Sequence, residues 1–67
     1  MLFQKKIDYH LQEILVYFVD QDGRKQGTLK AYFADKNKEI REELLLYTQE
    51  YKDGETIEGK RDYFYSK

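Results

Sequence analysis

The chain has 67 residues, a formal net charge of −1, 37% charged and 16% aromatic residues, and no proline, cysteine or tryptophan. This length allows a single domain, 1–67, and a chain of ~60 residues buries only ~60% of the surface that it exposes when unfolded. Without cysteine there is no disulfide framework and no cysteine-based zinc site, two common sources of stability in small proteins. The aromatic content is too high for a disordered chain.

The sequence indicates a cytoplasmic protein with no membrane association. No stretch approaches the ~20 apolar residues that span a bilayer. The first residues do not resemble an export signal, because Lys5 and Lys6 follow the first apolar residues and polar side chains interrupt what comes next. The nearly balanced charge provides no global field that would attract nucleic acid or anionic lipid.

The first eleven residues fit two interpretations. Phe3, Ile7 and Leu11 match the apolar stripe of a helix, and together with Tyr9 they match one face of a strand. No glycine or proline separates this segment from the next one, which favours an extended chain. The apolar positions change from odd to even numbers after Leu11, so we predict a bulge or bend around 10–13.

A β-hairpin is the clearest prediction. The segment Ile14–Val19 is rich in β-branched and aromatic residues, which favour strands. Asp22-Gly23 follows, and Asp-Gly is a strong signal for a two-residue type I′ turn, in which both positions need a positive φ. We therefore predict a central hairpin of strands at about 13–20 and 25–34, paired symmetrically about this turn.

The symmetric pairing divides the hairpin's side chains between two faces, and a slip of one residue would mix them. It also places Asp20 opposite Lys25, which is a favourable cross-strand pair. One face collects Ile14, Val16, Phe18, Leu29, Ala31 and Phe33. The other face collects Leu15, Tyr17, Val19, Thr28, Lys30 and Tyr32.

A helix at about 37–52 is predicted next. Asp35 and Asn37 are candidate caps for its first turn. An apolar stripe follows at spacings of four, three and four residues, and Gly54 is suited to end the helix in the left-handed conformation. The stripe consists of Ile40, Leu44, Tyr47 and Tyr51.

A short strand at 60–66 is expected to end the fold. The predicted class is therefore α+β, a small two-layer domain in which one helix packs on an antiparallel sheet of three to four strands.

Apolar residues outside this predicted core suggest an interface. The second hairpin face retains Leu15, Tyr17, Val19 and Tyr32, and Leu45 and Leu46 point away from the helical stripe. We interpret either the two leucines or the four residues of the hairpin face as a contact surface for a second copy or for a protein partner, and a homodimer is its simplest form. The alternative without a binding role is that another segment covers the hairpin face and that the leucines are ordinary surface residues.

The sequence offers little catalytic chemistry, and we expect no enzyme, no cofactor and no metal site. His10 is the only histidine, its nearest acidic neighbour is Asp8, and Ser66 is the only serine. Asp20 could begin a calcium loop, but the sixth and twelfth positions of that loop are Lys25 and Ala31 instead of glycine and glutamate. The four glycines are too dispersed to cradle a phosphate.

The predicted function is that of a small non-enzymatic interaction or regulatory protein, which binds another macromolecule and acts as a homodimer. The alternative is a protein that binds single-stranded nucleic acid by stacking bases on sheet tyrosines while cations hold the backbone. The near-zero net charge counts against this alternative. Its candidate residues are Tyr17, Lys30, Tyr32, Arg61, Tyr63 and Tyr65.

Overall fold

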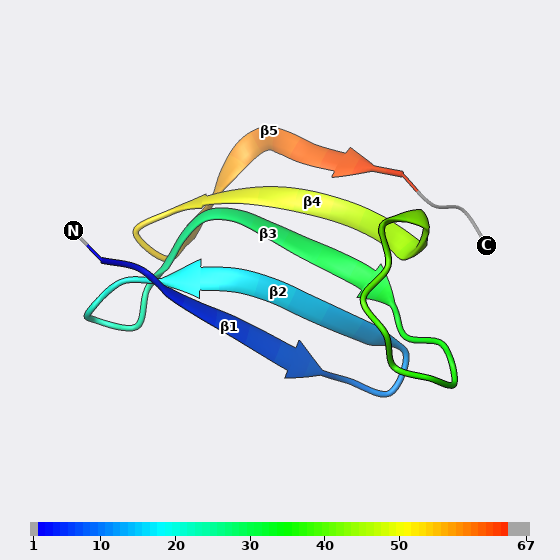
Figure 1. Ribbon diagram of the computed structural model, residues 1–67. Coiled ribbons are helices and arrows are strands. Elements are labelled where there is room, and N and C mark those ends of the chain that lie inside the picture. Colours follow the sequence, from blue (N-terminus) through cyan, green and yellow to red (C-terminus); the bar gives the residue numbers. More distant parts are fainter. Residues whose placement is uncertain (1, 65–67) are drawn as a thin grey trace.

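The computed structural model describes residues 2–64, which form one five-stranded antiparallel sheet (Figure 1). Strands that follow one another in the sequence are neighbours in the sheet, so the order is β1-β2-β3-β4-β5. A single 3-10 turn, η1 (Glu42–Leu44), precedes β4. The strands are β1 (Gln4–Tyr9), β2 (Glu13–Val19), β3 (Lys25–Phe33), β4 (Leu45–Lys52) and β5 (Glu55–Tyr63). The prediction of an α+β two-layer domain is therefore wrong, and the fold is all-β.

The ambiguous first segment is a strand. β1 pairs with β2 from Gln4 opposite Val19 to Tyr9 opposite Ile14. Between the two strands the chain reverses in a tight turn, in which the His10 amide donates to the Glu13 carbonyl at 2.8 Å. The bend predicted around 10–13 is thus a complete reversal of the chain.

β2 and β3 form the predicted central hairpin, with a different turn. The Asp20 amide donates to the Arg24 carbonyl and the Gly23 amide donates to the Asp20 carbonyl, both at 3.0 Å. Gly23 has a φ of 82°, and Asp22 is not among the residues with a positive φ. This is a three-residue loop with its left-handed residue at Gly23, not the predicted two-residue type I′ turn.

The longer loop changes the pairing of the hairpin. Val19 lies opposite Lys25, and beyond a bulge Leu15 lies opposite Ala31. Residues that face each other across the strands share one side of the sheet, so Ala31 lies on the side of Leu15 and not, as predicted, on the side of Ile14. The predicted grouping of the hairpin side chains is therefore wrong.

The helix predicted at about 37–52 is absent from the described chain, and its second half is β4. Asp35 does accept the Asn37 amide at 3.0 Å, as a cap would, but Lys38 then takes a φ of 55° and the turn stops. β4 occupies the edge of β3 opposite to β2, where it pairs with backbone groups that would otherwise lack partners. The apolar spacing was compatible with a helix, but pairing with β3 decided the structure.

Asp53 and Gly54 form the turn between β4 and β5. Their φ values are 53° and 86°, and two consecutive positive values are characteristic of the type I′ hairpin turn. Gly54 is therefore left-handed as predicted, but it joins two strands and does not end a helix. β5 is longer than the predicted short last strand and contains a bulge opposite the middle of β4.

The sheet has two faces, defined here by cross-strand pairing. The groove face carries Lys5, Ile7, Tyr9, Ile14, Val16, Phe18, Gln26, Thr28, Lys30, Tyr32, Leu45, Thr48 and Glu50. The tyrosine face carries Lys6, Asp8, Glu13, Leu15, Tyr17, Val19, Lys25, Leu29, Ala31, Tyr47, Gln49, Tyr51, Arg61 and Tyr63.

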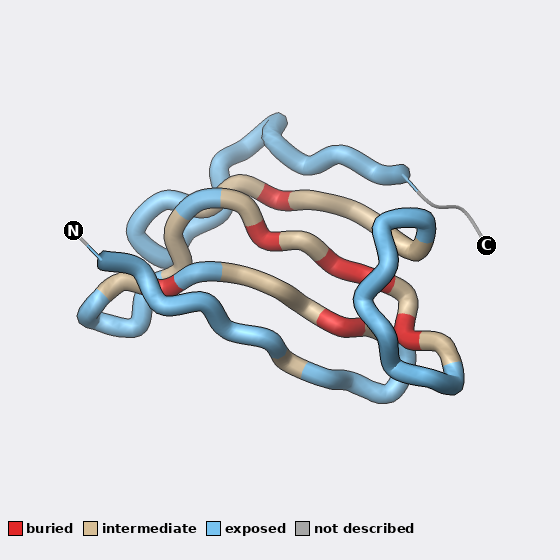
Figure 2. Tube along the Cα trace, viewed as in Figure 1, coloured by how far each residue is buried: buried red, intermediate tan, exposed pale blue. Residues whose placement is uncertain are grey.

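The buried core is small and is divided between the two faces. Its members come from β2, β3, β4 and the residue after β3, whereas β1 and β5 are almost entirely exposed (Figure 2). Ile14 is the largest fully buried side chain. The buried residues are Ile14, Val19, Leu29, Ala31, Tyr32, Ala34 and Gln49. Within residues 2–64, no helix has the length and apolar character needed to cross a bilayer.

Candidate functional site

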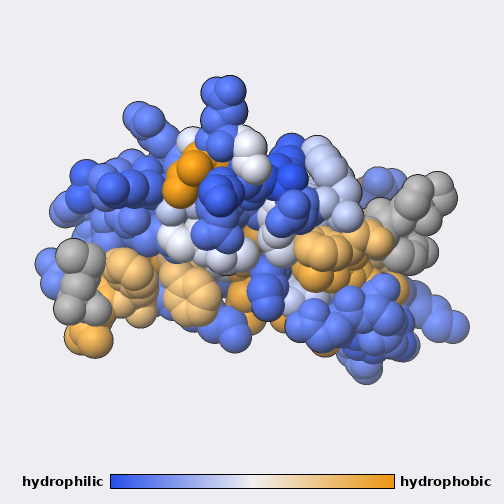
Figure 3. Space-filling model, turned by 90° about the horizontal axis from the view of Figure 1, so that it is seen from above, coloured by the Kyte–Doolittle hydropathy of each residue, from blue (hydrophilic) through white to orange (hydrophobic). Residues whose placement is uncertain are grey.

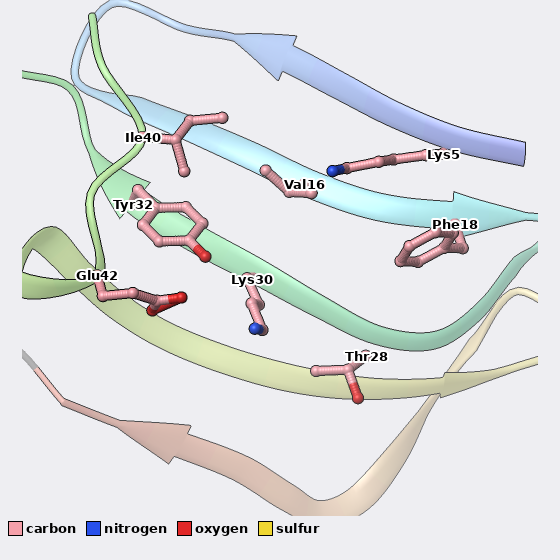
Figure 4. A pocket seen from close by; sticks show the side chains of 8 residues that line it. All are labelled: Lys5, Val16, Phe18, Thr28, Lys30, Tyr32, Ile40 and Glu42. Atoms are coloured by element: carbon pink, nitrogen blue, oxygen red, sulfur yellow. The ribbon is translucent and has the colours of Figure 1, made fainter.

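A groove of about 480 Å³ lies on the groove face, between the sheet and the β3–β4 connection (Figure 4). Apolar and aromatic side chains from β2 and β3 form much of its wall, and Ile40 and Glu42 from the connection close one side. Its lining consists of Lys5, Val16, Phe18, Thr28, Lys30, Tyr32, Ile40 and Glu42. This composition suits an apolar partner with charged groups at its edges.

Charged side chains of both signs surround the groove. Lys5 lies beside Phe18 at one end, and Glu42 lies beside Tyr32 at the other end, with Lys30 between them (Figure 4). In the described part of the chain, none of these three charged side chains forms an ion pair or a side-chain hydrogen bond. Burial and the charge of Glu42 raise the pKa of Tyr32 above its ordinary value. The groove therefore carries both cationic and anionic side chains.

The opposite face of the sheet carries two clusters in which a cation lies over two tyrosine rings. In the first cluster, Lys25 Nζ is 5.1 Å from the ring centroid of Tyr17 and 5.6 Å from that of Tyr51, within the range of cation–π attraction. The Tyr17 hydroxyl donates to Asp8 Oδ2 at 2.7 Å, and this hydrogen bond, with burial and the charge of Asp8, raises the pKa of Tyr17.

Arg61 organises the second cluster. Its guanidinium carbon is 4.3 Å from the ring centroid of Tyr47 and 5.7 Å from that of Tyr63, and its Nη1 donates to the Tyr63 hydroxyl at 3.3 Å. The two rings are tilted by 52° with centroids 6.0 Å apart. Burial is the main cause of the raised pKa of Tyr47, to which the charge of Glu13 adds and which that of Arg61 opposes. Tyr63 remains 72% exposed.

The four hairpin residues predicted as one contact surface are divided between the two faces of the sheet. Leu15, Tyr17 and Val19 lie on the tyrosine face, where Val19 is buried. Tyr32 lies on the groove face and is also buried, packed with Ile14.

The other two predicted interface residues belong to β4. Leu45 packs against the core cluster that contains Tyr32. Leu46 is half-buried at a bulge between β3 and β4, and its carbonyl accepts the Phe64 amide at 2.9 Å. Neither leucine projects from a helix as the sequence had suggested.

The residues predicted to bind nucleic acid are also divided between the faces. The tyrosine face carries Tyr17 in the Lys25 cluster, and it carries Arg61 and Tyr63 in the second cluster. The groove is lined instead by Lys30 and Tyr32. Tyr65 lies outside the described residues.

Four residues of the tyrosine face that bear on nucleic-acid binding were missing from the predicted set: Lys6, Lys25, Tyr47 and Tyr51. The alternation of Tyr47, Gln49 and Tyr51 would have revealed two of them if this segment had been interpreted with the two-residue period of a strand.

Among residues 2–64, no side chain forms a hydrogen bond or an ion pair with the His10 imidazole. This residue is exposed in the β1–β2 turn, and Asp8 accepts the hydrogen bond from Tyr17. Among residues 2–64, no cluster of three or more His, Cys, Asp or Glu side chains is arranged to hold a metal ion.

A polar cluster joins the β2–β3 turn to the β4–β5 turn. Gln26 Nε2 donates to Asp20 Oδ2 and to Asp53 Oδ1, both at 2.9 Å, and Gln26 Oε1 accepts the Asp53 amide at 3.1 Å. Asp20 also accepts the amides of Arg24 and Asp22 and pairs with the Arg24 guanidinium at 3.2 Å. The Gln26 hydrogen bond, then these amides and the Arg24 charge, lower the pKa of Asp20 to about 2.

This cluster predicts a loss of stability in acid. An unfolded Asp20 takes up its proton near the ordinary pKa of 3.8, whereas the folded chain resists protonation until about 2. The stabilisation is therefore complete above about pH 4 and disappears as the pH falls toward 2. We expect Asp20→Asn to unfold at a lower urea concentration than the wild type at about pH 6, with a smaller difference at about pH 2. Asp62→Asn, on exposed β5, is the control, and an Asp20→Asn difference that is equal at both pH values would contradict the prediction.

Comparison of the chain with protein-family models, with curated proteins and with solved structures finds no match.

Proposed function

We propose that this chain is a small non-enzymatic interaction protein that forms a homodimer through its groove face. One observation carries the proposal: large apolar side chains remain exposed on one face of a single sheet. Phe18 is 38%, Ile7 39%, Tyr9 60% and Ile40 39% exposed. Stable domains bury such a face against a second layer, and residues 2–64 supply only one sheet and a connection over part of it.

The dimensions of the molecule support the need for a further layer. Its accessible surface is 5056 Å², compared with about 4,500 Å² for a compact monomer of this mass. Its radius of gyration is 12.2 Å, compared with about 11 Å for a compact chain of this length. The molecule extends over 35 × 25 × 17 Å, so a broad face is large enough to bury the ~800 Å² per partner of a standard interface.

The charge distribution of the groove favours a second copy as the partner. In a two-fold dimer the same patch meets itself, so its two ends must be complementary. The groove carries both signs of charge, so Lys5 of one copy can lie against Glu42 of the other copy. Seen from above, apolar atoms also gather in patches along one half of the molecule, separated by hydrophilic side chains (Figure 3).

Self-association can be tested by sedimentation equilibrium of the wild type and of a variant with a charge in the proposed interface. Phe18→Lys is expected to raise the dimer dissociation constant at least about tenfold, because it removes a large apolar side chain from the interface and places there an ammonium group that loses its hydration. Tyr63→Lys is the matched control, since it introduces the same charge on the other face and should leave the dimer intact. A wild type that stays monomeric at high concentration, or a dimer insensitive to Phe18→Lys, would overturn the proposal.

A further inference from the structure

The tyrosine face combines unpaired cations with accessible rings. Within the described residues, Lys25 and Arg61 form no ion pair, and each lies over two tyrosines. Lys6 lies opposite Tyr17 on the same face and is exposed. A cation that lies over a ring and forms no ion pair keeps N–H donors, and such donors form strong charge-assisted hydrogen bonds to phosphate.

The carboxylates of this face do not neutralise these cations. Asp8 accepts the hydrogen bond of the Tyr17 hydroxyl, and Glu13 lies near Tyr47, whose pKa it raises. The net charge of −1 belongs to the whole chain and includes acidic residues of the turns and of the β3–β4 connection. The local balance on the tyrosine face is three cations against two carboxylates.

The rings provide stacking surfaces in two places. Tyr17 and Tyr51 lie on either side of β3, and Tyr47 and Tyr63 lie on adjacent strands β4 and β5. Tyr63 is 72% exposed, and the Arg61 guanidinium beside it supplies a second planar surface. Proteins that bind single strands use this combination, in which unpaired bases stack on aromatic rings while cations contact the phosphates.

We infer that the tyrosine face binds single-stranded nucleic acid, with a base stacked on Tyr63 and the backbone held by Lys6, Lys25 and Arg61. A duplex is excluded from this mode, because its bases are already stacked on one another. The inference is independent of dimer formation, since the tyrosine face lies on the other side of the sheet from the groove.

Binding can be measured by fluorescence anisotropy with labelled single-stranded RNA and DNA of about 16 nucleotides, the upper end of the site size of small sheet-based binders. With three phosphate contacts, the affinity is expected to fall about 20-fold between about 50 and 200 mM salt. Tyr63→Ala is expected to weaken binding at least about fivefold, because it removes a stacking surface. Arg61→Gln should weaken binding. It should also reduce the slope of log affinity against log salt concentration by the contribution of about one phosphate contact.

Two controls separate stacking from general charge effects. Tyr63→Phe keeps the ring and should bind like the wild type, and Lys36→Ala removes an exposed charge from the β3–β4 connection and should also have no effect. The folded state of each variant is checked by circular dichroism. Absence of binding at low salt, binding that Tyr63→Ala does not weaken, or tighter binding to a duplex than to a single strand would each overturn the inference.

Discussion

Replacing Ile14 with alanine is expected to lower the free energy of unfolding by about 2–5 kcal/mol. Ile14 is fully buried and packs with Tyr32 and Ala34, and no other described large side chain is buried to the same extent. A domain of this size has a total stability of only about 3–10 kcal/mol, so the substitution removes a large part of it. The change is measured as the shift in the urea midpoint at one fixed protein concentration, because self-association would add to the apparent stability.

Ile57→Ala provides the matched control for this experiment. Ile57 lies on the edge strand β5 and is 37% exposed, so the same change in side chain removes much less buried surface. We expect its effect to be less than half that of Ile14→Ala. Equal effects of the two substitutions would contradict the burial of Ile14 in the core.

Replacing Gly54 with alanine is expected to lower the free energy of unfolding by about 1–2 kcal/mol. Gly54 has a φ of 86° in the turn that joins β4 to β5, and residues with a Cβ are strained in that region. Space is not the limiting factor, because an added Cβ would lie 3.5 Å from Cβ of Arg24, an ordinary contact distance. The loss therefore measures backbone strain, and thermal unfolding followed by circular dichroism can detect it.

Gly54→Asn distinguishes strain from crowding. Asparagine also carries a Cβ, but it enters the left-handed region more readily than alanine does. We expect Gly54→Asn to cost less than half as much as Gly54→Ala. If asparagine were as destabilising as alanine, contact with Arg24 and not backbone conformation would explain the loss.

Local signals in the sequence predicted some elements and failed for others. The β-branched and aromatic segment Ile14–Val19 is a strand, and Gly54 is left-handed, as expected. The segment after Lys38 was assigned to a helix because the spacing of Ile40, Leu44, Tyr47 and Tyr51 satisfies a helical period. The last two of these also satisfy a strand period, and periodicity alone cannot choose between the two structures.

The register of the central hairpin illustrates a second limit. Asp22-Gly23 is compatible with a two-residue loop and with a three-residue loop, and the difference of one residue decides which face Ala31 joins. The bonds that stabilise the longer loop include the contact of Asp20 with Gln26, which in turn contacts Asp53 of the other turn. A partner 27 residues away in the sequence leaves no local signal.

The candidate sites followed from these assignments. Once β4 is a strand, Tyr47 and Tyr51 join Tyr17 and Tyr63 on one face, and Arg61 and Lys25 lie over their rings. The helix prediction had placed the first two of these tyrosines in a buried stripe. The groove likewise depends on the β3–β4 connection, which carries Glu42 over the sheet.

Length and composition by themselves showed that this chain has few means of stabilising itself, because it is short and contains no cysteine. The sequence also determined where strands are favoured, since that preference depends on local side chains. Only the tertiary structure decided that residues 2–64 form one five-stranded sheet, because the free edge of β3 requires hydrogen bonds that a helix could not supply. The same pairing left one apolar face and one tyrosine face uncovered, since a single sheet exposes both of its sides.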